Sequence, residues 1–521
     1  MKIPSCEVYT KISGAIKCSV RKIAQVVGIS KSSAHRHVQK INKRNLYPES
    51  HLWETEEGHL WLCRLYFGSI LFFVVHCGVG SGKLSLFFKF LRLNERVATS
   101  SSKIRAVAQE ICRLLDKYQQ EQEHPIDKGL KIVGGVDETY FKSMILVLMD
   151  LSSGYIFVEE ESDDKSYETW LEKVKKVTNK FNIEFKYFVS DRAKQLIKLA
   201  TQGFESSSIP DLFHASHELV KLFGLKLKRQ KTTIEDKLSK ELAKLALLNE
   251  LSKDFNIQKN IVKELKKEQA AISEGISIYR EILYKLSTNM HPFNIENSSI
   301  MTSAKIEILL YNIQQQAEDL KKNRNVLSKK DHLAKFKKQI KGMASLIDTW
   351  WIWVDECLQD ADIDQDFKLW VRQSLLPFLY WQKQAARTKS PDLKEAYQHA
   401  ADQAQAELDH HPLTQVYMEK QEILSWAKWM VANFQRTSSA VEGRNGWLSQ
   451  MNHNERGISP KRLKAQTVLH NYYLKRDDGT TAAERLFHHK FPDPLEWVVE
   501  RMGDLPLPRK RKSNITCEAI S

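Results

Sequence analysis

The spacing of hydrophobic residues changes several times along the 521-residue chain. Residues 1–125 and 231–430 carry apolar residues three and four positions apart, the period of amphipathic helices. Residues 126–230 contain short apolar or alternating runs broken by turns, which is typical of strands. We therefore expect a helical N-terminal region, the first part of an α/β core, a helical insertion, the last part of the core at 431–490 and a basic tail at 491–521.

The strand signals in the first core segment follow a clear order. The stretches "KIVGGVDETY", "SMILVLMDL" and "YIFVEEE" can form a meander of three strands. A helix is expected over residues 165–180, then a strand at "EFKYFVS", a helix at "RAKQLIKLATQG" and a short strand around "IPDLFHA". This order predicts a mixed five-stranded sheet of the α/β class, with all-α regions before it and inserted into it.

Residues 19–41, "SVRKIAQVVGISKSSAHRHVQKI", have the pattern of a helix-turn-helix. Gly28 suits the left-handed residue of the turn, and Ser30 is a natural N-cap for a second helix. An ordinary helical hairpin has the same pattern, but a basic, hydroxyl-rich outer face favours DNA binding. The candidate DNA contacts on that face are Lys31, Ser32, Ser33, His35, Arg36 and Gln39.

The helical insertion has two strong hydrophobic features. Leucines and an isoleucine recur at spacings of three and four from Ile234 to Leu251, which predicts a seam for helix pairing. The stretch "TWWIWVDECL" adds three tryptophans, which are large anchors for a helical core. We therefore expect residues 231–430 to form a helical subdomain with a core of its own, and its role is left open.

Composition narrows the class of partner and compartment. The chain has 79 Lys and Arg against 64 Asp and Glu, a formal charge of +15, which favours a polyanionic partner. Its seven cysteines are scattered without a C-x-x-C pair, as expected in a reducing compartment such as the cytoplasm. The most apolar window, residues 66–75, is too short to cross a bilayer, so we expect a buried helix there and no membrane partner.

Three acidic residues stand where catalytic carboxylates are expected. Asp137 interrupts an apolar strand in "GGVDETYF", Asp191 ends a later strand in "FVSDRAKQL", and Glu442 opens a helix in "SSAVEGRNGWLSQ" after the insertion. In their order and strand context, these stretches resemble the bacterial insertion-sequence transposases of the DDE type. The resemblance implies a ribonuclease H-like catalytic core with a long helical insertion before the third acid.

The resemblance also implies a chemistry. Asp137, Asp191 and Glu442 would be both the catalytic residues and the ligands of two Mg²⁺ ions, for which Mn²⁺ substitutes. Two such ions clamp the attacking and leaving oxygens of a phosphoryl transfer. Water would free a 3′-hydroxyl, which then attacks target DNA. The implied partners are double-stranded DNA (element ends and target) and further copies of the chain, as a homodimer or higher oligomer in the bacterial cytoplasm, associated with the nucleoid.

Other polar residues near these acids are auxiliary candidates. Asp211, in "IPDLFHASH", lies by the next strand signal and is the main rival to Asp191. His214 is more typical of a satisfied strand-end residue, although it could contact the scissile phosphate. Glu138 follows Asp137 directly, and because side chains alternate across a strand we expect it on the opposite face, in an ion pair.

The polar residues around the third acid are candidate DNA contacts. Arg436 precedes Glu442, and Arg444 and Asn445 follow it. Asn445 shares a helix face with Glu442 and could orient a phosphate or a metal-bound water. Capping and ordinary surface polarity would account for the same residues.

Two other functions fit the same sequence. A helix-turn-helix regulator derived from a transposase would bind DNA without cutting it, but it would commonly have lost one of the three acids. A metal-dependent nuclease would share the site without joining strands.

Overall fold

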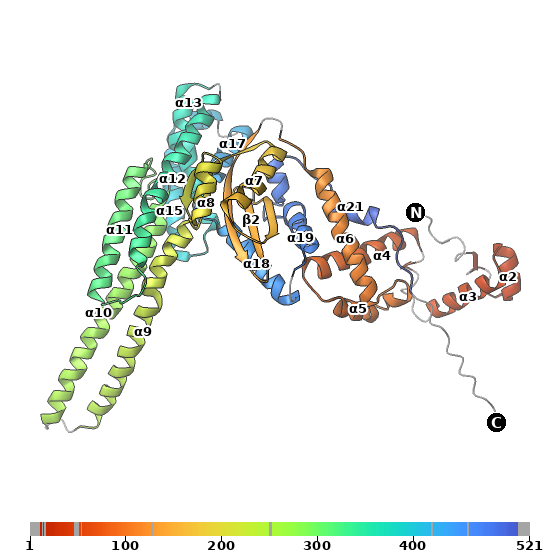
Figure 1. Cartoon of the computed structure of the whole chain (residues 1–521), viewed down its shortest axis with the longest axis horizontal. Coiled ribbons are helices and arrows are strands. Elements are labelled where there is room, and N and C mark those ends of the chain that lie inside the picture. Colours follow the sequence, from red (N-terminus) through yellow and green to blue (C-terminus); the bar gives the residue numbers. More distant parts are fainter. Residues whose placement is uncertain are drawn as a thin grey trace.

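The structure is a computed structural model. It describes residues 11–12, 14, 17–45, 52–53, 55–126, 129–248, 253–361, 363–417, 420–455 and 458–508. The last part of the expected basic tail, from residue 509 onward, lies outside the described residues. Figure 1 shows a central sheet between layers of helices, with a long helical hairpin projecting from it.

The central sheet has five strands in the order β3-β2-β1-β4-β5. β1 is antiparallel to β2 and β2 to β3, whereas β1, β4 and β5 are parallel. The predicted mixed five-stranded sheet is therefore confirmed. The strands are β1 (Leu130–Tyr140), β2 (Met144–Asp150), β3 (Ile156–Ser162), β4 (Ile183–Ser190) and β5 (Ser207–Pro210).

The strand register places two acids in one row across the sheet. Asp137 on β1 is opposite Val147 on β2, and Val147 is opposite Glu159 on β3. Residues directly opposite one another share a face, and neighbouring strands lie about 4.8 Å apart. The Asp137 and Glu159 side chains therefore leave the same face of the sheet, two strands apart.

Helices cover both faces of the sheet (Figure 1). The face that carries Val147 belongs to a large core shared with α9 (Leu212–Ala246), α12 (His332–Asp360), α17 (Gln421–Ala432) and α18 (Ser439–Glu455). The other face packs with α6 (Ser101–Gln122), α7 (Tyr167–Phe181), α8 (Lys194–Lys198), η4 (Leu199–Gly203) and α19 (Pro460–Tyr472). Both faces of the sheet are thus covered by hydrophobic cores.

The two helices predicted at residues 19–41 are present as α2 (Val20–Val27) and α3 (Lys31–Asn45), joined by a short turn. Gly28 ends α2 with a φ of 71°, the left-handed conformation that glycine adopts without a steric penalty. The hydroxyl of Ser30 accepts a hydrogen bond from the Ser33 backbone N–H at 3.2 Å. These two helices have a small core of their own.

The rest of the N-terminal region packs against the sheet, so the expected boundary at residue 125 does not separate two hydrophobic cores. Helices α4 (Glu56–Ser69), η2 (Ile70–His76), α5 (Ser81–Phe90) and η3 (Leu93–Glu95) pack with α6 into the cluster that contains one face of the sheet. Within the described residues, the 21-residue stretch Glu56–His76 is long and apolar enough to span a membrane by length and composition. Half of its most apolar window is buried in the fold, and a core helix passes the same test.

The insertion begins earlier than predicted and does not have a separate core. Helix α9 runs unbroken from Leu212 to Ala246, so the expected boundary at 230–231 falls inside it. The tryptophans of α12 share one hydrophobic cluster with Val133 of β1 and Tyr187 of β4. The remaining helices are α10 (Lys253–Asn289), α11 (Ser303–Asn323), α13 (Gln365–Trp370), η5 (Val371–Leu375), α14 (Leu376–Arg387), α15 (Pro391–His410) and α16 (Pro412–Tyr417).

The C-terminal segment returns to the sheet. After α18 and α19 come α20 (Ala482–Phe487) and α21 (Pro494–Arg501). Helix α21 packs against α4 and α6, and its Trp497 and Val498 are buried. The segment from residue 491 is therefore structured as far as residue 508, and the prediction of a simple basic tail from 491 is wrong for this part.

Candidate active site

Asp137 lies on the central strand, on the face that α18 covers. Gly135 shares that face two residues earlier, and a Cβ added there would approach Cγ2 of Val441 on α18 to 2.9 Å. The glycine therefore lets the helix close onto the strand. One turn along α18 from Val441, Asn445 donates a hydrogen bond from Nδ2 to Oδ2 of Asp137 at 2.8 Å.

Glu138 points to the opposite face, as alternation predicted. Its carboxylate accepts hydrogen bonds from Trp170 Nε1 at 3.2 Å and from Gln195 Nε2 at 3.0 Å. Lys165 Nζ lies 3.5 Å from its other oxygen. Glu138 is thus paired away from α18, which leaves Asp137 as the acid of this strand that faces the helix.

Asp191 follows the neighbouring parallel strand β4 and is exposed. Its Oδ1 accepts a hydrogen bond from the backbone N–H of Ala193 at 2.9 Å. Arg192, between them, has a φ of 65°, a strained conformation for a residue with a side chain. Strain of this kind is concentrated at functional sites, where the surrounding structure holds it in place.

Glu442 lies in the first turn of α18 with its side chain 35% exposed. One carboxylate oxygen is 3.0 Å from Nε2 of His214. His214 lies in the first turn of α9 and not at a strand end, so the predicted placement is corrected. The structure therefore brings His214 to the third acid.

The charges of the other two acids act on Asp137. Burial is the largest factor that raises the pKa of Asp137, to about 7, and the negative charges of Glu442 and Asp191 raise it further. Hydrogen bonding to the Glu138 backbone and the nearby His214 lower it in part. Asp137 is thus close enough to both other acids to sense their charge.

Asp211 has a different role from the one expected. It is fully buried and caps α9, accepting a hydrogen bond from the Phe213 N–H at 2.8 Å. Its other oxygen accepts the hydroxyl proton of Ser438, just before α18, at 2.5 Å. Its own N–H donates to Ser190 O at the end of β4 at 2.9 Å. Asp211 therefore joins the three segments that carry the site, and it lies beyond β5 and not on it.

The donor set fits a hard divalent cation, although the side chains are not gathered around one. Among the described residues, no group of three or more His, Cys, Asp or Glu is arranged to hold a metal ion. The carboxylates of Asp137, Asp191 and Glu442 are oxygen donors of the kind that Mg²⁺ prefers. Oδ1 of Asn445 is buried without a hydrogen-bond partner, beside Asp137. A cation or its bound water would satisfy that oxygen and relieve the repulsion among the acids.

Two predicted DNA contacts are corrected by their surroundings. The Arg444 side chain is only 4% exposed and forms an ion pair with Glu159. The Arg436 guanidinium donates to the backbone oxygens of Ser287 and Met290 at 2.9 and 3.0 Å. The Arg444 guanidinium is therefore buried away from phosphates, and the guanidinium of the partly buried Arg436 holds backbone oxygens of the insertion.

The candidate contacts on α3 are placed as expected. Ser33 is half-buried, whereas the others are exposed: Lys31, Ser32, His35, Arg36 and Gln39. Arg36 folds back onto its own helix, with Nη2 3.1 Å from the Ser33 hydroxyl. The apolar side of α3 is made by Ala34 and Ile41, which are buried, and by Val38, which is partly buried against the same cluster.

Glu159 is the functional candidate that the sequence analysis missed. It is buried on β3, in the same row as Asp137. The sequence feature that could have revealed it is the run of three glutamates at 159–161. Because side chains alternate between the two faces of a strand, at least one of these glutamates must lie on a covered face. A buried glutamate requires a partner, and that partner is Arg444.

Comparisons with known proteins give no function. Residues 371–514 match the model of a family of unknown function, DUF6399. The matched range contains Glu442 and the whole of α18 and α19. No curated protein and no solved structure matches the chain.

Proposed function

We propose that this chain is a DNA transposase that cuts and joins the ends of a mobile element by metal-dependent phosphoryl transfer. The proposal is supported by the placement of Asp137, Asp191 and Glu442 on neighbouring elements. Asp137 is on β1, Asp191 follows the adjacent strand β4, and Glu442 is on α18, which packs on β1 and bonds Asp137 through Asn445. The resemblance to DDE transposases implies this placement, in a ribonuclease H-like core.

The residues of the chain have separate tasks in this proposal. The three carboxylates hold Mg²⁺ or Mn²⁺, which supplies charge stabilisation for the attacking and leaving oxygens. Asn445 fixes one oxygen of Asp137 through its Nδ2 and keeps Oδ1 for a polar partner. His214 contacts one carboxylate oxygen of Glu442 and leaves the other for an ion. No side chain needs to act as a covalent nucleophile.

The test is cleavage of the DNA that flanks the gene by the purified full-length chain in Mg²⁺. We expect nicks with free 3′-hydroxyl ends and joining of those ends to a target plasmid. Asp137→Asn, Asp191→Asn and Glu442→Gln should each reduce cleavage by more than about 100-fold, the upper range for disturbing a metal site's supporting contacts. Asp163→Asn, at an exposed acid after β3, is the matched control and should cleave normally.

DNA binding should survive these substitutions because affinity comes from phosphate contacts elsewhere. Arg36→Ala and Lys31→Ala on α3 should instead weaken binding to the flanking DNA. Binding without any cleavage in Mg²⁺ or Mn²⁺ would refute the enzyme and favour the regulator. Cleavage without joining would favour the nuclease.

A further inference from the structure

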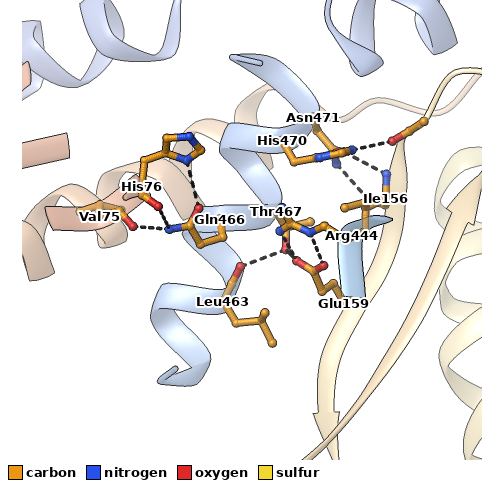
Figure 2. Close-up of polar contacts among 11 residues, drawn as sticks. Val75, His76, Ile156, Glu159, Arg444, Leu463, Gln466, Thr467, His470 and Asn471 are labelled. Carbon is orange, nitrogen blue, oxygen red and sulfur yellow. Dashed lines mark hydrogen bonds and ion pairs between the residues drawn. The ribbon is translucent and has the colours of Figure 1, made fainter. Parts of the chain in front are cut away.

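The second acid of the sheet row, Glu159, is held by a completely buried set of bonds. Arg444 of α18 donates from Nε to Oε1 at 2.7 Å and from Nη2 to Oε2 at 2.6 Å. The Thr467 hydroxyl of α19 donates to the same Oε2 at 2.7 Å. The side chains of Arg444 and Glu159 are 4% and 0% exposed. Figure 2 shows all three groups meeting between the helices and the strand.

Helix α19 fixes this set to the sheet without the help of α18. The Asn471 amide pairs with the backbone N–H and C=O of Ile156, each at 2.9 Å, along the edge strand β3. His470 Nε2 lies 2.9 Å from the carbonyl oxygen of Gly154. Figure 2 shows Asn471 and His470 side by side on α19, one turn beyond Thr467. Glu159 therefore offers α18 an anchor whose position is already determined.

Helix α18 uses adjacent residues to reach the two acids of the row. Arg444 binds Glu159 on β3, and Asn445 binds Asp137 on β1. Successive helical residues point about 100° apart, so satisfying both contacts leaves one rotation and one axial position for the helix. Glu442, two residues before Arg444, is carried to its place by that same rotation.

A second contact supports the same orientation of α18. The Arg444 guanidinium stacks on the Trp447 ring at 4.5 Å. Trp447 in turn stacks on His76 at the end of η2, with ring centroids 5.8 Å apart. His76 Nδ1 lies 3.4 Å from Gln466 Oε1 of α19 (Figure 2). Arg444 and Trp447, one turn apart on α18, are thus both in contact with elements outside the insertion.

We propose that the Glu159–Arg444 pair is a positioning device that sets α18 so that Glu442 and Asn445 face Asp137. The inference rests on the proposed function, because it deepens the role of the same site. A buried ion pair is an uncertain source of stability compared with apolar residues of similar size, but its directional bonds can specify one arrangement. Glu159 and Arg444 are positioning residues here and touch neither metal nor DNA.

The experiment uses the full-length chain with both charges removed, as Glu159→Gln with Arg444→Gln. Removing both leaves no unpaired buried charge, so the variant should fold, as checked by thermal unfolding. We expect its affinity for Mn²⁺, measured by electron paramagnetic resonance, to fall about 10- to 100-fold, the range for groups that orient metal ligands. The kcat for cleavage should fall as well, while the Kd for DNA stays unchanged.

The matched control removes a half-exposed ion pair in the insertion, as Asp355→Asn with Arg372→Gln. It should leave Mn²⁺ affinity and kcat unaltered. If the double glutamine variant does not fold, Thr467→Val removes one bond to Glu159 without changing charge, and it should still weaken Mn²⁺ binding measurably.

The outcomes separate this inference from the proposed function. Wild-type protein that binds Mn²⁺ in a manner lost in Asp137→Asn supports the site. If folded Glu159→Gln/Arg444→Gln, or Thr467→Val in its place, then binds Mn²⁺ as tightly as the wild type, the positioning role is refuted and the site remains. If the wild type binds no Mn²⁺, the proposed function and the positioning role fail together.

Discussion

Asp137 and Glu159 stand in the same row of the sheet beneath the same helix, yet their surroundings are opposite in character. Glu159 has a bidentate arginine and a hydroxyl, so all of its charge is matched. Asp137 has one neutral amide and two other acids nearby, and its pKa is raised to about 7. The charge of Glu159 is neutralised by an arginine of the same chain, whereas Asp137 has no arginine or lysine among the described residues bonded to it.

The difference shows how one helix can stabilise a fold and leave a reactive site in it. Glu159, whose charge is paired, fixes the position of α18. That position in turn sets how Asn445 and Glu442 lie relative to Asp137, whose charge is not paired. If arginine stood at position 445 as well, both acids would be matched and no cation would be required. We therefore expect that removing the counter-charge of Glu159 destabilises the protein, whereas removing or neutralising the charge of Asp137 stabilises it at neutral pH.

The largest effect on stability is expected from breaking the Glu159–Arg444 pair. Arg444→Met leaves the buried Glu159 carboxylate without its counter-charge, which costs about 3–5 kcal/mol of unfolding free energy. The double variant Glu159→Gln/Arg444→Gln should recover most of that loss. Urea unfolding in EDTA measures both, and a single variant within about 1 kcal/mol of the wild type would show that water already reaches the pair.

Asp137 should make the free energy of unfolding depend on pH in the metal-free protein. Because the folded-state pKa of Asp137 is raised from 3.8 to about 7, the folded chain keeps a proton that the unfolded chain releases in this interval. The stabilisation from this group is therefore complete only below the unfolded pKa of 3.8, and it is lost as pH rises from 3.8 to about 7, by up to about 4 kcal/mol in all. Urea unfolding between pH 4.5 and 8 measures most of this loss.

Asp137→Asn is the control for this pH dependence. It removes the titrating group but keeps the size of the side chain, so the curve should be flatter than that of the wild type by the same amount. An identical pH dependence in both proteins would mean that Asp137 is ionised in the folded state without cost.

A divalent cation bound at Asp137 should compensate the negative charge there and stabilise the folded protein. At a concentration 100 times Kd, a ligand that binds only the folded state adds about 2.7 kcal/mol. We expect Mg²⁺ to raise the Tm of the wild type at pH 7.5 and to leave Asp137→Asn nearly unchanged. An equal rise in both proteins would place the cation at another site.

The sequence allowed the local features of the fold to be predicted, because they depend on neighbouring residues. The turn at Gly28 and the alternation that separates Asp137 from Glu138 follow from backbone geometry within a few positions. The three acids were located through a family resemblance and their strand context. The structure places them on neighbouring elements, although no three such residues are grouped to hold a metal ion in the described part of the chain, and their metal-binding role remains a prediction.

The features that sequence reasoning missed depend on distant partners. Arg444 resembled a phosphate contact because nothing near it in sequence is acidic except Glu442, and its partner Glu159 lies on β3. The boundary at residue 231 failed because α9 combines the core and the insertion in one continuous helix. The independent core expected for the insertion failed because its tryptophans pack into the same cluster as the sheet.

The smallest effects are expected from glycines on the two sides of α18, and they should differ in sign. Gly446 is on the exposed side of the helix, with nothing within 4 Å of an added Cβ. Gly446→Ala should therefore stabilise the metal-free protein by about 0.5–1 kcal/mol, the usual difference in a helix interior. Gly135→Ala, beneath the helix, should destabilise it by about 1–3 kcal/mol, because the methyl group meets Leu151 and Val441 in a packed core. Thermal and urea unfolding of the two variants give the comparison directly. If Gly135→Ala were neutral, α18 would not be held closely against β1, and the argument that its contacts place Glu442 beside Asp137 would lose its geometric basis.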